Sequence, residues 1–138
     1  MIERSPVVVD ASVIVDVLAG RDDAQRAWLA WARTGTWLLA PPLLPFEVAN
    51  ALVRGHAVPA ALAGEQVRTM LEAGVDLADR GVDGLAIAIE LAERHRLAVY
   101  DAAYLWLAID TDAELATFDR ALAAAATAEG VPLAIALD

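Results

Sequence analysis

Short apolar runs alternate along this chain with longer stretches of helical periodicity. Three valines at positions 7–9 stand between Pro6 and Asp10 and predict a buried strand. Similar runs predict strands at 36–40, 97–100 and 115–117, with a fifth at an edge at 132–137. The spacing between them predicts helices at 11–18, 22–33, 44–54, 59–73, 84–94, 101–109 and 119–129. This alternation is typical of an α/β fold with three layers (α/β/α), in which helices flank a central parallel sheet of four to five strands.

Composition narrows the class of protein. The 138 residues suit a single domain over positions 1–138, since no linker or repeat divides them. There is no cysteine, which excludes disulfides, thiolate zinc sites and a cysteine nucleophile. No apolar run reaches the ~18 residues of a membrane span, and the N-terminus does not look like a signal peptide. We expect a soluble, cytoplasmic protein without membrane contacts.

The charges restrict the partners. All ten basic residues are arginine, so the lysine of a P-loop is missing. The net charge of −10 argues against nonspecific binding of nucleic acid through a basic surface. It predicts instead that a tightly bound protein partner carries basic residues.

Four acidic residues recur at one place in the predicted topology. Asp10, Asp101 and Asp119 follow predicted strands, and Glu47 lies on the helix after another. The carboxyl ends of parallel strands form one rim, where four carboxylates would repel each other unless a cation lay between them. Taken singly, each acid is also explained as a helix cap or a solvated position. Their recurrence favours a site for Mg²⁺ or Mn²⁺ in an enzyme that acts on phosphates.

Polar neighbours of these acids are candidates for supporting roles. Ser12 and Thr117 offer hydroxyls next to two of the acids, and Tyr104 shares a helix face with Asp101. Asn50 and Arg54 share a helix face with Glu47. The residues considered for contact with the scissile phosphate are Arg54 and Arg120, although each arginine is equally explained as an ion-pair partner of the acids.

Four segments carry a resemblance to a known family. They are VVDASV, FEVANAL, YDAAYLWLA and LATFDRAL, in this order between residues 7 and 122. They resemble the successive motifs of PIN domains, above all of VapC-type toxins from bacterial toxin–antitoxin pairs. The resemblance implies a PIN-like fold and a Mg²⁺- or Mn²⁺-dependent endoribonuclease, usually dimeric and restrained by a cognate antitoxin. It implies catalytic and metal-binding roles for Asp10, Glu47, Asp101 and Asp119, supported by Ser12, Thr117 and Asn50.

Two tryptophans are candidate contacts for the antitoxin. Trp28 and Trp31 lie on the second predicted helix, and tryptophan is enriched in binding hot spots. They are interpreted either as contacts in an antitoxin groove or as part of the core. Two other functions stay open at this point: a PIN-type nuclease that processes RNA or cleaves DNA without a toxin role, and a non-catalytic metal-binding interaction module.

Overall fold

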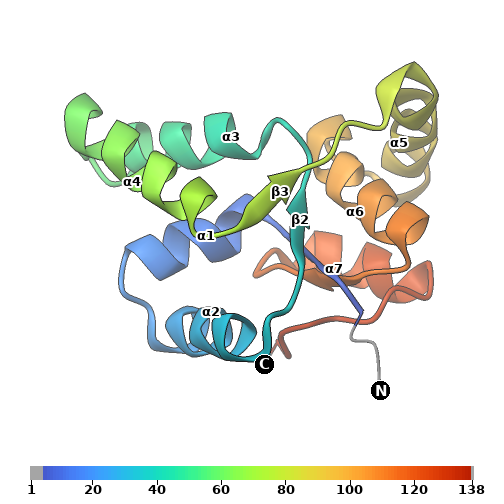
Figure 1. The fold of residues 1–138 in the computed structure, drawn as a ribbon. Helices are drawn as coiled ribbons and strands as arrows, with labels where there is room; N and C mark the ends of the chain where they lie inside the picture. Colours follow the sequence, from blue (N-terminus) through green and yellow to red (C-terminus); the bar gives the residue numbers. More distant parts are fainter. Residues whose placement is uncertain (1–4, 138) are drawn as a thin grey trace.

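The computed structural model describes residues 5–137, which build a parallel sheet flanked by helices (Figure 1). The sheet has four strands in the order β3-β2-β1-β4, and all three pairings are parallel. Val8 at its centre pairs with Leu39 on one side and with Leu115 on the other. The strands are β1 (Val7–Val9), β2 (Leu38–Ala40), β3 (Val75–Leu77) and β4 (Glu114–Ala116).

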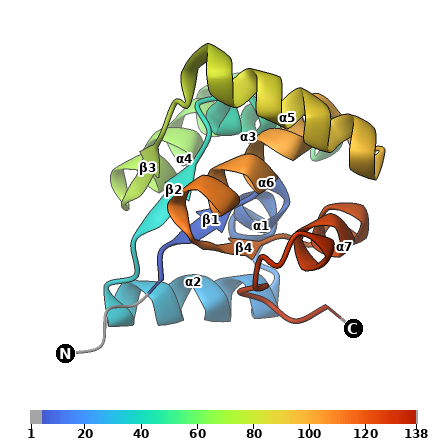
Figure 2. The same cartoon turned by 90° about the vertical axis from the view of Figure 1, so that its right-hand side faces the viewer.

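Helices cover both faces of this sheet. On one side α6 packs against β1 and β4, with α5 and α7 against it. On the other side lie α1, α3 and α4, with α2 packed on α1 (Figures 1 and 2). A π-helical turn, η1 (Ala51–Gly55), continues α3. The helices are α1 (Ala11–Leu18), α2 (Asp22–Thr34), α3 (Leu44–Asn50), α4 (Ala60–Glu72), α5 (Gly81–His95), α6 (Val99–Thr111) and α7 (Arg120–Ala128).

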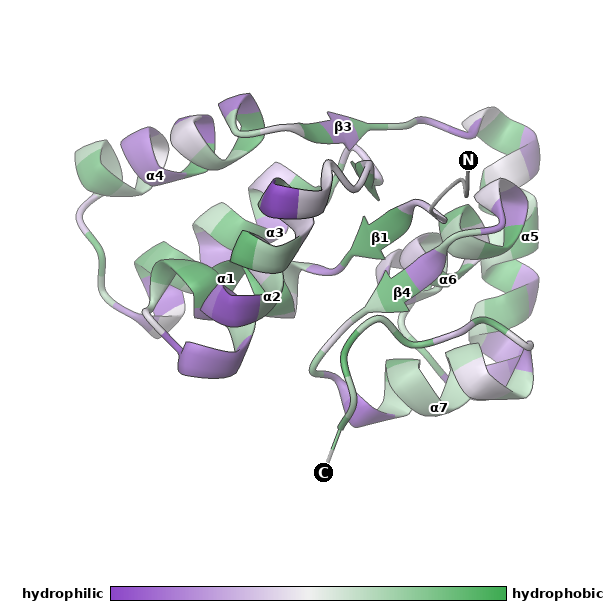
Figure 3. Ribbon diagram, turned by 60° about the horizontal axis from the view of Figure 1, so that its bottom comes forward, coloured by the Kyte–Doolittle hydropathy of each residue, from purple (hydrophilic) through white to green (hydrophobic). Residues whose placement is uncertain are grey.

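The core is built from the central strands and from α6. All three residues of β1 are buried, as expected for a strand covered on both faces, and β1 and β4 are coloured largely as apolar in Figure 3. Tyr104 and Leu105 of α6 are fully buried, so this helix is apolar on more than one side. In the described part of the chain, no helix has the length and apolar character needed to cross a membrane.

The prediction of a strand at 97–100 is wrong. Helix α6 already begins at Val99, and Ala98 has the extended backbone of its N-cap. The run Leu97-Ala98-Val99-Tyr100 is apolar for another reason: Leu97 packs partly against the core, whereas the last two side chains are exposed on the surface. A short apolar run does not by itself distinguish a strand from the start of a helix.

The third strand in chain order is β3, in a segment for which the sequence predicted neither a helix nor a strand. Only Val75 of β3 is buried, while Asp76 and Leu77 are exposed at the edge of the sheet, so no apolar run marks this strand in the sequence. The predicted fifth strand at 132–137 is wrong as well. It is reduced to a single bridge between Leu133 and Leu115.

Candidate active site

Asp10 lies at the turn from β1 into α1 and is almost completely buried, with 5% of its surface exposed. Its Oδ2 atom accepts a hydrogen bond from Ser12 Oγ at 2.9 Å and another from Thr117 Oγ1 at 2.7 Å. Burial raises the pKa of this carboxyl, although both hydroxyl bonds favour the ionised form and oppose the rise. The two hydroxyls therefore fix the orientation of Asp10 and offset part of the cost of its charge.

The same hydroxyls join two distant turns of the chain. The backbone N–H of Phe118 donates to Ser12 Oγ at 3.0 Å, and that of Asp119 donates to Thr117 Oγ1 at 3.0 Å. The turn after β4 is thereby held against the turn after β1. Asp119 Oδ1 also accepts from the N–H groups of Ala121 and Leu122, which caps α7.

Glu47 enters the site from α3 and is held from the opposite side of the sheet. Tyr104 OH of α6 donates to Glu47 Oε1 at 2.6 Å, and the tyrosine side chain is fully buried. Burial and the carboxylate acceptor raise the pKa of Tyr104, so its hydroxyl stays protonated as a donor. The pKa of Glu47 is raised as well, first by burial and then by the charges of Asp10 and Asp101.

Asp101 occupies the first turn of α6 rather than the end of a strand, so this part of the topological prediction is corrected. Burial raises its pKa to about 6, and the charges of Asp10 and Asp119 add to the rise. The four predicted acids line one open hollow of about 400 Å³. The structure thus brings all four together at the rim.

A fifth acid in this hollow, Asp16, was missed by the sequence analysis. It lines the hollow from α1, and its Oδ2 atom is 2.8 Å from Nη1 of Arg21. The same arginine lies over the ring of Phe118, 4.2 Å from its centroid. The available signal was the spacing of Ser12 and Asp16, four residues apart on one helix face.

The remaining candidate residues lie around this hollow. Asn50 is exposed beside Glu47 in an adjoining shallow hollow. Arg54 is exposed in η1, and Arg120 is the first residue of α7, next to Asp119. All charged side chains among the described residues that line the acidic hollow are carboxylates.

The two tryptophans of α2 lie in another part of the molecule. Trp31 is 9% exposed and belongs to the core, and Trp28 packs against the core while partly exposed. Both also line a hollow of about 400 Å³ together with Trp37, whose Nε1 donates to Asp76. Trp31 is therefore in part a packing residue, as the alternative interpretation expected.

The donor set of the acidic hollow suits a hard divalent cation. Carboxylate oxygens are the ligands that such ions prefer. The pKa values of Asp10, Glu47 and Asp101 are each raised first by burial and further by the charge of at least one other acid of the hollow. Within residues 5–137, no three acidic or histidine side chains stand, as they are, where they could hold a metal ion together. The residues fit a cation by their chemistry and by the hollow they share, while the side-chain positions of the described residues do not yet converge on one ion.

Comparisons with known proteins show the family of this chain and structures of similar fold. The model of the PIN domain matches residues 7–128. The chain is similar to Ribonuclease VapC1 of Mycobacterium tuberculosis, with 37% identity over 132 residues that cover 94% of this chain and 96% of that protein. A crystal structure from Pyrobaculum aerophilum has a TM-score of 0.68 and 26% identity, covering 88% of this chain and 86% of the other. A toxin–antitoxin complex from Klebsiella pneumoniae is similar in fold, with a TM-score of 0.65, 20% identity, and coverage of 82% and 86%.

Proposed function

Because this chain belongs to the PIN-domain family and is of the VapC type, we propose that it is an endoribonuclease, the toxin of a type II toxin–antitoxin pair. It hydrolyses RNA phosphodiester bonds with water as the nucleophile. The observation that carries this proposal is the acidic hollow, where carboxylates from four separate segments of the chain converge. Metal dependence is typical of the family, and a hollow whose charged lining is entirely acidic needs a cation before an RNA phosphate can approach.

The cofactor of this proposal is Mg²⁺ or Mn²⁺, held by Asp10, Glu47, Asp101 and Asp119. Bound there, such a cation supplies charge stabilisation at the scissile phosphate and a lower pKa for the attacking water. The chain itself supplies preorganisation. Ser12 and Thr117 hold the carboxylate of Asp10, and Tyr104 holds that of Glu47, so neither needs to reorient when the site fills.

Cationic side chains near the hollow are proposed to guide the RNA. Arg120 starts α7 beside Asp119, and Arg54 lies exposed in η1, near the end of the helix that carries Glu47. We propose that each guanidinium contacts a phosphate that flanks the scissile one. Asn50, exposed next to Glu47, is proposed as a further polar contact with the substrate.

The partners in this proposal are RNA, a cognate antitoxin and a second copy of the chain, all in the cytoplasm. The net charge of −10 favours an antitoxin with basic residues. Trp28, partly exposed beside a hollow of α2, is proposed as an antitoxin contact. Trp31, which is mostly buried, would support that contact by packing beneath it.

Cleavage assays on the antitoxin-free protein test the proposal. We would incubate it with single-stranded RNA, structured RNA and single-stranded DNA in the presence of Mg²⁺, Mn²⁺ or EDTA. We expect RNA cleavage that needs a divalent cation and is lost in Asp101→Asn, whereas the matched control Asp22→Asn, an exposed acid of α2, stays active. Cleavage of DNA alone, or equal cleavage by both variants, would contradict the proposed activity.

A further inference from the structure

Arg21, the N-cap residue of α2, is paired along its edge with two carboxylates and on one face with an aromatic ring. Its Nη1 atom is 2.8 Å from Asp16 Oδ2. Its Nε atom is 2.8 Å from Asp23 Oδ1, and its Nη2 atom is 3.1 Å from Asp23 Oδ2. Its Cζ atom lies over the ring of Phe118, 4.2 Å from the centroid. Contacts from three segments of the chain therefore fix the plane of this guanidinium.

The backbone of Arg21 is held as firmly as its side chain. The connection between α1 and α2 turns at Gly20, whose φ of +85° lies in the region that favours glycine. The N–H of Arg21 then donates to the carbonyl of Asp16 at 2.9 Å, and its carbonyl accepts from the N–H of Gln25 at 3.0 Å. Because Arg21 is already ordered in this way, little entropy is lost when a ligand packs against it.

One face of the guanidinium remains open to solvent. The Arg21 side chain is 52% exposed, although its edge is paired and Phe118 covers one face. The open face is flat because a guanidinium is planar, and the ring behind it packs partly buried against the core. We call this surface, formed by Arg21 and Phe118, the Arg21 platform.

The Arg21 platform borders the acidic hollow. Phe118 directly precedes Asp119 in the chain, and both Asp119 and Asp16 line the hollow. The N–H of Phe118 donates to Ser12 Oγ, which joins the platform to the start of α1. A nucleotide whose phosphate lies in the hollow therefore has this platform at its side, next to Asp16 and Asp119.

Charge determines which part of an RNA molecule suits the platform. One cation lies between the carboxylates of Asp16 and Asp23, so the local net charge is negative and a phosphate is repelled. A neutral, flat group can instead stack on the open face. In RNA that group is the nucleobase, and guanidinium planes are a known stacking surface for the unstacked bases of single strands.

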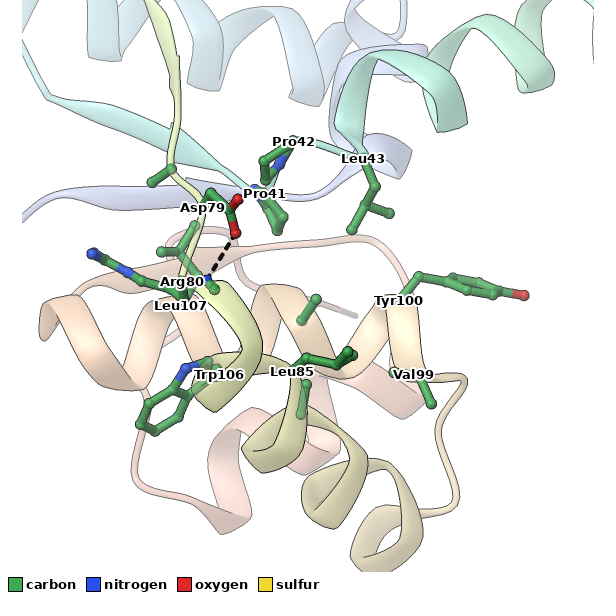
Figure 4. Close-up of a pocket in the computed structure, with 15 residues that line it drawn as sticks. Pro41, Pro42, Leu43, Asp79, Arg80, Leu85, Val99, Tyr100, Trp106 and Leu107 are labelled. Carbon is green, nitrogen blue, oxygen red and sulfur yellow. Dashed lines mark hydrogen bonds between the residues drawn. The ribbon is translucent and has the colours of Figure 1, made fainter.

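Other aromatic surfaces suit a base less well. The described residues that line the acidic hollow include no aromatic side chain. On its opposite side Phe46 is 80% exposed, so few contacts hold this ring in one orientation. The cavity of about 350 Å³ between α5, α6 and the loop Pro41–Leu43 contains Trp106 (Figure 4). Among the described residues, this cavity shares none of its lining with the acidic hollow. The Arg21 platform is both fixed and adjacent to the hollow.

We propose that the Arg21 platform is a nucleobase subsite, on which the base of a nucleotide next to the scissile phosphate stacks. This inference rests on the proposed ribonuclease activity and specifies how its substrate is held. Stacking tolerates different bases but requires an unpaired one. We therefore expect cleavage in single strands and loops rather than within duplexes.

An oligomer without bases isolates the contribution of the base to binding. The probes are a labelled single-stranded oligoadenylate and a ribose-phosphate oligomer of equal length that lacks the bases, both with Mg²⁺. Binding is measured by fluorescence anisotropy in the Asp101→Asn background, so that the RNA stays intact. Arg21→Lys keeps the positive charge but removes the flat face. We expect it to weaken oligoadenylate binding about tenfold, as for the loss of one stacked base, and to leave binding of the base-free oligomer unchanged. The matched control is Arg26→Lys, at an exposed arginine of α2, which should change neither.

A second variant removes the ring beneath the guanidinium. Phe118→Leu keeps an apolar side chain at this position and should weaken oligoadenylate binding about two- to fivefold, the contribution of an exposed cation–π contact. Melting curves verify that both variants are folded.

Four results would separate this subsite from other roles of Arg21. Equal binding of the two oligomers by the background protein, or undiminished oligoadenylate binding by Arg21→Lys, would overturn the proposal. Equal losses for both oligomers would overturn it as well, because they would make Arg21 a backbone contact. Weaker binding of the cognate antitoxin alone would assign the platform to that partner instead of RNA. Base-dependent binding that Arg21→Lys removes, in a protein that cleaves no RNA, would count against the nuclease and support the subsite.

Discussion

At the scale of single residues, the candidate site is defined by which carboxylates have fixed partners and which do not. Asp10 accepts hydrogen bonds from the neighbouring Ser12 and from the distant Thr117, at 2.9 and 2.7 Å, and Glu47 accepts one from the distant Tyr104 at 2.6 Å. Asp101 is raised to a pKa of about 6 by burial and by its acidic neighbours. The first two are thus positioned in advance, and a bound cation would favour the ionised form of the third.

Removal of the tyrosine hydroxyl tests the positioning of Glu47. Tyr104→Phe keeps the buried ring but leaves Glu47 Oε1 without its donor, so we expect RNA cleavage to fall about tenfold and stability to drop by about 1–2 kcal/mol. The Tyr104 bond lowers the pKa of Glu47, so the acid limb of the activity profile should move to higher pH. Urea unfolding and a pH series of cleavage rates measure both effects. Tyr100→Phe, at a tyrosine that is 57% exposed, is the control and should change neither.

The raised pKa of Asp101 predicts an unusual dependence of stability on pH. A carboxyl with a pKa of about 6 in the folded state and 3.8 unfolded binds more protons when folded, so its contribution to stability is lost as pH rises from about 4 through 6. In metal-free protein at pH 7.5, Asp101→Asn should therefore raise the Tm by about 2 °C, and the gain should vanish near pH 4. Melting curves in EDTA at the two pH values decide this. A lower Tm of the variant at pH 7.5 would show that burial and the neighbouring charges do not destabilise the ionised carboxylate.

At the scale of elements, the turns decide where each acid enters the rim. Asp10 and Asp119 are the N-cap residues of α1 and α7, directly after β1 and close after β4. Hydrogen bonds from Thr117 to Asp10 and from Phe118 to Ser12 hold these two turns together. Helix α6 reaches the rim without a preceding strand, and its first turn carries Asp101. Parallel pairing of β1 with β4 is what brings the two fastened turns next to each other.

Two glycines of this fold differ in whether their positions tolerate a Cβ atom. Gly35 ends α2 with a φ of +65°, a conformation that a Cβ atom disfavours, so Gly35→Ala should lower the free energy of unfolding by about 1 kcal/mol. Gly64 lies inside α4, where an added Cβ would meet no atom within 4 Å, and Gly64→Ala should raise it by about 0.5–1 kcal/mol. Urea titrations of both variants measure whether the free energy of unfolding falls in the first and rises in the second. Equal effects at both positions would contradict the assigned backbone conformations.

At the scale of the whole molecule, charge and apolar surface are separated. The acidic hollow has a wholly acidic charged lining, whereas the cavity between α5, α6 and the Pro41–Leu43 loop is nearly uncharged. A third hollow, beside Trp28 and Trp37, lies against α2 and the start of β2. In the proposed function the acidic hollow binds RNA and the hollow beside Trp28 contributes to the antitoxin contact.

The antitoxin contact is tested by truncation of the partly exposed tryptophan. Trp28→Ala should weaken binding of the cognate antitoxin about tenfold or more, while the protein keeps a cooperative melting curve because Trp28 is not fully buried. Titration calorimetry at two salt concentrations measures both the loss and the electrostatic contribution of the basic partner. Leu62→Ala, at a half-exposed leucine of α4, is the control. Unchanged affinity, or a melting curve that collapses, would exclude this residue as a contact.

The sequence by itself determined the fold class, the four carboxylates and the family. Buried parallel strands are continuous apolar runs, and acids placed directly after them, or on the helix that follows, are visible without coordinates. That is why Asp10, Glu47 and Asp119 were found with their local settings right. The edge strand β3 was not predicted, because only one of its three residues is buried. The start of α6 was not predicted either, because a short apolar run is compatible with both a strand and a helix.

Only the tertiary structure decided how the site is held and what surrounds it. The bond from Thr117 to Asp10 spans 107 positions and the bond from Tyr104 to Glu47 spans 57, distances at which sequence spacing carries no information on contact. The same is true of Asp16 in the hollow and of Arg21 over the ring of Phe118. Local periodicity reports which side of an element is buried, but the packing of separate elements determines which side chains meet and which surface stays apolar.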